Sequence, residues 1–139
     1  MNWLFWSILS ATFAGATAVL AKIGVSDVDS NLATAIRTTV VLAFTWGLAL
    51  LTMPQRAMAN ITSRAWIFLT LSGLATGLSW LCYFRALQIG EASRVAPIDK
   101  LSVVFVLVFA ALFLNEPLTW KHWAGAGLIT GGAIVLASS

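Results

Sequence analysis

Five apolar segments, each close to membrane-spanning length, constrain this chain more than any other feature. They cover residues 3–23, 32–53, 65–89, 95–114 and 119–137, with short polar connectors between them. A helix needs about 20 residues to cross about 30 Å of hydrocarbon. Backbone amides in lipid must bond within their own segment, so each segment is expected to be helical. The sequence therefore predicts an all-α polytopic membrane protein, a bundle of five transmembrane helices that forms a single domain over residues 1–139.

The balance of residue types excludes a soluble protein of this size. Hydrophobic residues make up 60% of the chain and charged residues only 9%, far from the ordinary soluble composition. A short soluble chain keeps much of its surface in water and could not bury so many apolar side chains. We expect an integral membrane protein, in the inner membrane of a bacterium. The net charge of +3 rests on few residues, so we predict no nucleic-acid partner.

The N-terminal segment is interpreted as a retained first span. No basic residue precedes Trp3, and the apolar stretch that follows is longer than that of a signal peptide. Cys82 is the only cysteine, so no disulfide framework exists within the chain.

The two ends of the predicted bundle differ in chemistry. An odd number of spans places the termini on opposite sides. The end that holds Met1, here the tryptophan end, has an interfacial aromatic belt of Trp3, Trp6, Trp66, Trp120 and Trp123. The other end, here the charged end, has Lys22, Asp27, Asp29, Arg37, Arg85, Glu91, Arg94, Asp99 and Lys100.

The orientation in the membrane stays open. Arg56, Arg64 and Lys121 in the connectors favour a cytoplasmic tryptophan end. Counting the deeper basic residues of the charged end reverses that preference. Single and dual insertion are both compatible with this weak bias.

Ionisable residues within the spans are the first candidates for function. Arg37, Arg85, Asp99 and Lys100 lie at similar depth near the charged end. Burying such charges unpaired is costly, so we expect a pair between Arg85 and Asp99. Asp99 and Lys100 are neighbours on one predicted helix and are not expected to face each other.

Two interpretations of this charged cluster remain. In the functional one, it forms a gate or a substrate site suited to a carboxylate or a phosphate. In the structural one, Asp99 offsets the helix dipole just after Pro97, and the basic side chains extend to the lipid headgroups.

A polar stripe on the third span is the second candidate. Ser72, Thr76, Ser79 and Tyr83 recur at helical spacing, with Trp80 beside them. We interpret the serines as packing residues. Trp80 and Tyr83 are predicted to line a cavity, with Trp46 of the second span as their partner.

Small-residue spacings predict where helices meet. Gly73 with Gly77, and Gly127 with Gly131, repeat at four-residue spacing, and Gly125 precedes the second pair. These five glycines are the helix-interface candidates.

No enzyme pattern emerges from the sequence. It has no nucleophile–base set, no metal-ligand spacing and no phosphate loop. His122 stands alone in its connector, so no metal site is predicted. We expect no enzyme activity and no cofactor.

The motifs of the second half, in their order, resemble a known family. YFRALQIGEAS is followed by RVAPIDKLSVVF, LFLNEPLTW and GAGLITGGAIVL, and the chain resembles the EamA-type domain of the drug/metabolite transporter superfamily. The resemblance implies two five-helix repeats of inverted orientation with a substrate cavity between them. This chain holds one such repeat, which implies an antiparallel homodimer or a paralogous partner chain.

One departure limits what the resemblance implies. The related small multidrug resistance proteins use a glutamate in their first span, and the first span here has no acidic residue. Their proton-exchange mechanism is therefore not carried over to this chain.

The leading hypothesis is a transporter of small metabolites or drugs, an exporter that works by alternating access as a dimer. Arg85 and Asp99 would form the gate, while Trp46, Trp80 and Tyr83 line the cavity. The alternative is a non-transporting accessory subunit of a heteromeric or lipid-handling complex. The identity of the substrate and the coupling ion are not assigned by the sequence.

Overall fold

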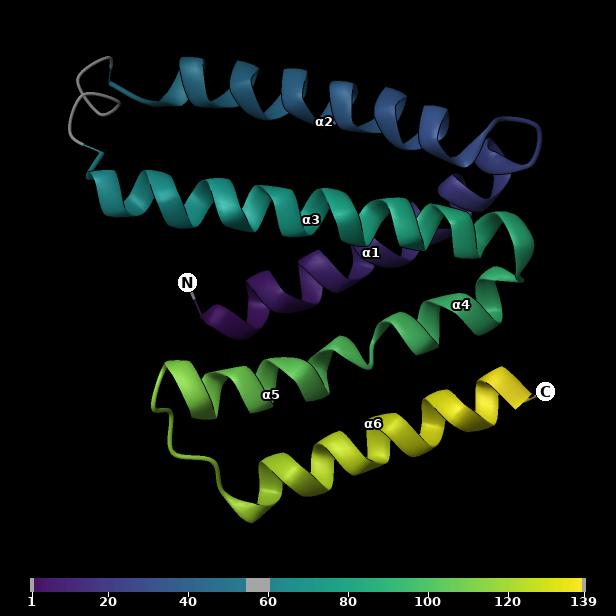
Figure 1. Cartoon of the computed structure of the whole chain (residues 1–139), viewed down its shortest axis with the longest axis vertical. Helices are drawn as coiled ribbons and strands as arrows, with labels where there is room; N and C mark the ends of the chain where they lie inside the picture. Colours follow the sequence, from purple (N-terminus) through teal and green to yellow (C-terminus); the bar gives the residue numbers. More distant parts are fainter. Residues whose placement is uncertain (1, 55–60, 139) are drawn as a thin grey trace. The chain divides into compact units, whose positions relative to one another are not determined.

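The structure is a computed structural model that describes residues 2–54 and 61–138. This part of the chain folds into helices and contains no strand. The helices are α1 (Trp3–Val25), α2 (Ser30–Thr52), α3 (Ser63–Ile89), α4 (Ala92–Asp99), α5 (Ser102–Phe113) and α6 (Trp120–Ser138) (Figure 1). The all-α prediction is confirmed. Arg56, which entered the orientation argument, lies outside the described residues.

Four helical stretches are long and apolar enough to cross a membrane. They are α1, α2, α3 and the stretch Ala92–Phe113 that contains α4 and α5. Their large apolar side chains are mostly exposed, as Leu51 is at 87% and Leu20 at 68%. Such exposure is unfavourable in water and favourable in lipid. The prediction of a polytopic membrane protein is therefore confirmed.

The fourth predicted span is divided rather than continuous. One helix ends at Asp99 and the next begins at Ser102, and Figure 1 shows a short non-helical segment between α4 and α5. The sequence favoured an uninterrupted helix over residues 95–114, because its apolar run continues to Leu114 without another charge after Lys100.

Backbone hydrogen bonding explains the division. Pro97 lies inside α4, where it has no N–H to donate to the carbonyl four residues earlier. After the proline, two amides bond to carbonyls three residues back instead of four. Lys100 N–H donates to the Pro97 carbonyl at 3.1 Å and Leu101 N–H to the Ile98 carbonyl at 3.0 Å. Val103 then bonds to the Lys100 carbonyl at 3.1 Å. A proline followed by bonds of this 3₁₀ type interrupts the regular helix.

The end of α5 falls where the sequence predicts a stop. Asn115 has a positive φ of 52°, a conformation that asparagine tolerates better than most residues. The amide of Glu116 then donates to the carbonyl of Ala110 at 3.2 Å. The Asn115-Glu116-Pro117 connector thus ends this helix by its own backbone geometry.

The chain divides into two compact units. The first unit comprises Met1–Lys22 and Ile89–Ser139, and the second comprises Ile23–Gln88. In the first unit α6 packs against α4 and, over a shorter stretch, α5. Ala110, Ala126 and Ala133 are buried there, because small side chains let membrane helices approach closely.

The second unit is built on the antiparallel helices α2 and α3 (Figure 1). Asp29 caps α2 by accepting hydrogen bonds from the amides of Asn31 and Leu32 at 2.9 and 3.2 Å, which satisfies donors that a helix start leaves unpaired. Phe84 and Leu87 of α3 are buried.

Candidate functional site

Arg37 of α2 lies over two aromatic rings of α3. Its guanidinium carbon is 4.4 Å from the ring centroid of Trp80 and 5.3 Å from that of Phe84. Trp80 and Phe84 are four residues apart, so they share one face of their helix. Both distances are those of cation–π contacts, in which the negative face of the ring stabilises the cation. We call Trp80 and Phe84 the aromatic cradle of Arg37.

Arg37 is half-buried and well inside the apolar part of α2. It lies seven residues after Ser30, the first residue of the helix, which corresponds to about 10 Å along the axis. In the described part of the chain its side chain has neither a hydrogen bond nor an ion pair, so the aromatic rings are the partners the structure provides.

Tyr83 lies on α3 between Trp80 and Phe84 in the sequence. Trp46, the third predicted cavity residue, does not belong to the cradle. It is nine residues after Arg37 on α2, about 14 Å along the axis, and its side chain is 45% exposed. The structure therefore groups Arg37 with Trp80 and Phe84 and does not place Trp46 among them.

Phe84 is a member of this site that sequence reasoning missed. The useful signal was its position, four residues after Trp80 on the face already predicted to line a cavity.

Arg85 has a partner on its own helix. Its guanidinium Nη1 donates to Gln88 Oε1 at 2.6 Å, and Gln88 Nε2 donates to the carbonyl of Val28 at 3.1 Å. Arg85 is thereby linked to the connector before α2. Gln88 was not predicted, because an uncharged amide near a helix end has no distinctive sequence pattern.

Asp99 and Lys100 form an ion pair, contrary to the sequence prediction. Lys100 Nζ lies 3.2 Å from Asp99 Oδ2. The prediction was wrong because it placed both residues on one regular helix. Asp99 is the last residue of α4 and Lys100 caps it, so the two side chains can turn toward each other at the division between α4 and α5. The pairing of Arg85 with Asp99 stays a prediction.

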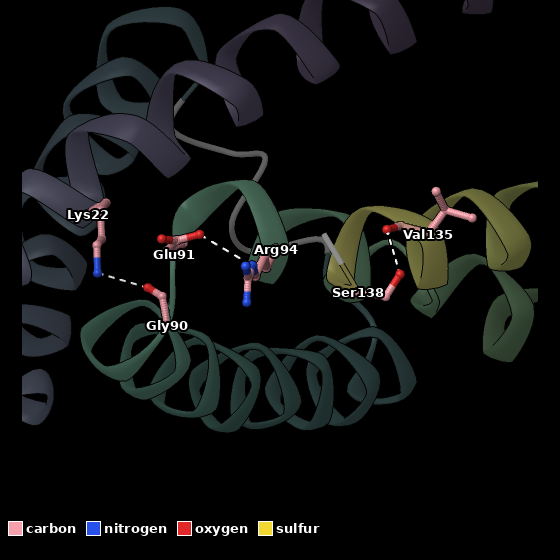
Figure 2. Close-up of polar contacts among 6 residues, drawn as sticks. All are labelled: Lys22, Gly90, Glu91, Arg94, Val135 and Ser138. Carbon is pink, nitrogen blue, oxygen red and sulfur yellow. Dashed lines mark hydrogen bonds and ion pairs between the residues drawn. The ribbon is translucent and has the colours of Figure 1, made fainter.

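Further polar contacts of the first unit hold the start of α4 (Figure 2). Lys22 Nζ donates to the carbonyl of Gly90 at 2.8 Å. Arg94 Nε lies 3.3 Å from Glu91 Oε2. Lys22, Glu91 and Arg94 were predicted at the charged end, but the sequence did not indicate which of them make contacts.

The five glycine candidates are not in close contact with another part of the described chain. A β-carbon built at each meets no heavy atom within 4 Å; they are Gly73, Gly77, Gly125, Gly127 and Gly131. Their role at an interface with another chain stays a prediction.

Comparison with known proteins gives a consistent result. A model of the EamA-like transporter family matches residues 1–138. The chain is 51% identical over 136 residues to an uncharacterized transporter in the cobO 3'region of Sinorhizobium sp, which covers 98% of this chain and 96% of that protein.

More distant relatives have a more specific name. A probable 4-amino-4-deoxy-L-arabinose-phosphoundecaprenol flippase subunit ArnE from Pseudomonas fluorescens is 31% identical over 85 residues, or 60% of this chain and 71% of the relative. The same subunit from Yersinia pestis is 31% identical over 84 residues, with the same shares covered. No solved structure matches the chain.

Proposed function

The chain belongs to the EamA-like transporter family, and from that premise we propose that it exports small metabolites or drugs by alternating access, acting as a dimer. Family membership and the transporter-named relative identify a membrane transporter or flippase rather than an enzyme. The substrate, the direction and the dimer are the proposed parts, together with a place in a bacterial inner membrane.

The observation that carries the mechanism is the division of the stretch Ala92–Phe113 at an ion pair. Discontinuous helices with polar groups at the break recur at the moving, substrate-binding parts of transporters. Ionisable residues inside a membrane are costly and are retained mainly where they act. Asp99 and Lys100 stand at this break, so the pair is suited to hold one conformation and to separate in the other.

We propose a pairwise assembly, supported by the length of a relative. In inverted-repeat transporters two repeats enclose the substrate site. The Sinorhizobium relative matches this chain over 96% of its own length, so that transporter-named protein has about the length of one repeat. We therefore propose that two such chains, inserted with opposite orientation, complete the cavity.

Transport in reconstituted vesicles tests this function. We expect the purified protein to move at least one solute from a broad panel of metabolites and drugs. We expect Asp99→Asn to lower that rate at least about tenfold, because the ion pair of the gate is lost. Glu116→Gln, outside the helices, is the matched control. A purified protein that moves no solute, or an Asp99→Asn variant as active as the wild type, would overturn the proposal.

Topology tests the dimer separately. Two reporters, each active on one side of the membrane, are fused in turn to the C-terminus. Signal from both supports dual insertion and an antiparallel homodimer. Signal from only one contradicts the antiparallel homodimer.

A second candidate is an accessory subunit of a heteromeric, lipid-handling complex. It is favoured by the relatives named as subunits of a flippase for a lipid-linked amino sugar. Copurification of a stoichiometric partner chain, with no transport by this chain alone, would select it.

A further inference from the structure

We propose that Arg37, held over Trp80 and Phe84, is an anion-binding residue of the transport site, and that the substrate carries a phosphate or a carboxylate. This inference rests on the proposed function and specifies its substrate class. The site lies wholly in the second unit, between α2 and α3.

The charge of Arg37 is not neutralised by an acidic residue of its own unit. The acidic residues of residues 23–88 are Asp27 and Asp29. The carboxylate of Asp29 caps the start of α2, and that of Asp27 accepts a hydrogen bond from Ser26 at 3.1 Å. An embedded arginine normally pairs with an acid or with backbone carbonyls. Here an incoming anion would supply the missing charge.

The hydroxyl groups of Thr34 and Thr38 on α2 do not form hydrogen bonds with Arg37 either. Thr34 Oγ1 donates to the carbonyl of Ser30 and Thr38 Oγ1 to that of Thr34, each at 2.7 Å. Among the described residues, no hydrogen bond from Arg37 to either hydroxyl oxygen is present.

The guanidinium of Arg37 does not lie where a side chain extended toward the lipid headgroups would place it. The charged end of this unit is the start of α2 and the end of α3, and Trp80 lies farther from that end than Phe84. A side chain reaching for the headgroups would pass Phe84. The guanidinium is instead closer to Trp80, at 4.4 Å, than to Phe84, at 5.3 Å. Arg37 is held at depth by the rings.

The chemistry of the guanidinium favours an anionic ligand. A guanidinium is always charged and has five N–H donors in a planar fork that matches carboxylate and phosphate oxygens. Aromatic rings contribute an apolar wall and a cation–π contact but accept no ordinary hydrogen bond. A few polar donors in an apolar wall are typical of small-molecule sites. Two anion sources fit this chemistry: a soluble metabolite or a lipid headgroup.

Binding to purified full-length protein in nanodiscs of neutral lipid tests the proposal. The probes are inorganic phosphate, acetate and dioctanoyl phosphatidic acid, with dioctanoyl phosphatidylcholine as the zwitterionic comparison. A ligand that binds only the folded state raises the unfolding temperature in a concentration-dependent way. We expect at least one anionic probe to raise it in the wild type.

The variants separate charge, geometry and fold. Arg37→Gln should weaken anion binding at least about tenfold, while Arg37→Lys should weaken it less, because a point charge replaces the fork. Arg64→Gln is the matched control, since Arg64 is exposed and lies 5.8 Å from the ring centroid of Phe68 at the opposite end of α3. It should bind like the wild type. The unfolding temperature without probe shows whether each variant is folded, and Arg37→Lys keeps the test decisive where Arg37→Gln does not fold.

Each outcome decides a point. Binding of phosphate or acetate supports a soluble anionic substrate, and binding of phosphatidic acid alone supports a lipid headgroup. No binding by any anionic probe, or unchanged binding by both Arg37 variants, overturns the proposal. Failure of the transport function is distinguishable, because an accessory subunit would bind the anion at Arg37 and move no solute.

Discussion

Lys22 of α1 and Gly90 of the connector before α4 are joined by a hydrogen bond of 2.8 Å, although 68 positions separate them in the sequence. The donor is an ammonium and the bond is partly buried, so it is stronger than a bond between neutral groups. It ties the end of α1 to the start of α4 within the first unit (Figure 2).

We expect Lys22→Met to loosen this connector. Loss of a bond from a charged donor costs about 1.5–3 kcal/mol, so amide hydrogen exchange should become faster from Gly90 to Val95. Lys121→Met, which replaces an exposed lysine of α6, is the control and should leave this segment unchanged. Equal exchange in wild type and Lys22→Met would show that the bond does not hold the connector.

The contact between Arg37 and Trp80 should appear as an energetic coupling. In a double-mutant cycle with Arg37→Met and Trp80→Leu, the two losses of stability should be non-additive by about 0.5–2 kcal/mol, the range of cation–π contacts. Denaturant unfolding in mixed micelles measures each variant. A second cycle pairs Arg37→Met with Trp66→Leu, at the far end of α3, and should be additive. Additivity in the first cycle would contradict the contact.

Pro97→Ala should make the stretch Ala92–Phe113 more continuous. The new amide restores a donor for the carbonyl four residues earlier, so α4 gains a hydrogen bond. We expect slower amide exchange around Lys100 and a transport rate lowered several-fold, because the break is the proposed moving part. Pro117→Ala, in the connector after α5, is the control. An unchanged transport rate in Pro97→Ala, together with slower exchange around Lys100, would contradict a role for the break.

Position 115 should tolerate glycine better than a β-branched residue. Its φ of 52° lies in the left-handed region, which glycine adopts without strain and which isoleucine strongly disfavours. We expect Asn115→Gly to retain or slightly raise stability and Asn115→Ile to lower it by about 1–2 kcal/mol. Thermal unfolding measures both. A similar loss in the two variants would show that the side chain of Asn115, rather than its backbone, matters.

The helices were predictable because apolar length is a strong signal in a membrane protein. The predicted segment 32–53 corresponds to α2 over Ser30–Thr52, and 65–89 to α3 over Ser63–Ile89. Helix starts differ by two residues, since a cap such as Asp29 adds a polar turn that hydrophobicity alone does not include.

The division at Lys100 was not predictable from the apolar run. The sequence contained its cause, Pro97, but a proline in the first turn of a helix is harmless and one in the interior breaks it. The choice depends on where the helix begins. The structure begins α4 at Ala92 rather than at Val95, which places Pro97 in the interior.

The contact between Arg37 and Trp80 was not predicted, although both residues were candidates. Arg37 was grouped with the embedded charges and Trp80 with the cavity, whereas the structure brings these two together. Arg85 donates to Gln88, a contact that the sequence did not indicate, and its pairing with Asp99 stays a prediction. Such pairings depend on the register of neighbouring helices, which helical periodicity within one segment does not encode.

The lengths of α4 and α5 also limit how this span can cross the bilayer. α4 has 8 residues and α5 has 12, and a helix needs about 20 to cross the hydrocarbon. Neither half reaches across alone, so the crossing persists only while the halves remain end to end. A bend at Lys100 shortens the hydrophobic span and creates a mismatch with thick membranes. We therefore expect thinner lipids to favour a bent conformation, and the transport rate to change with lipid chain length.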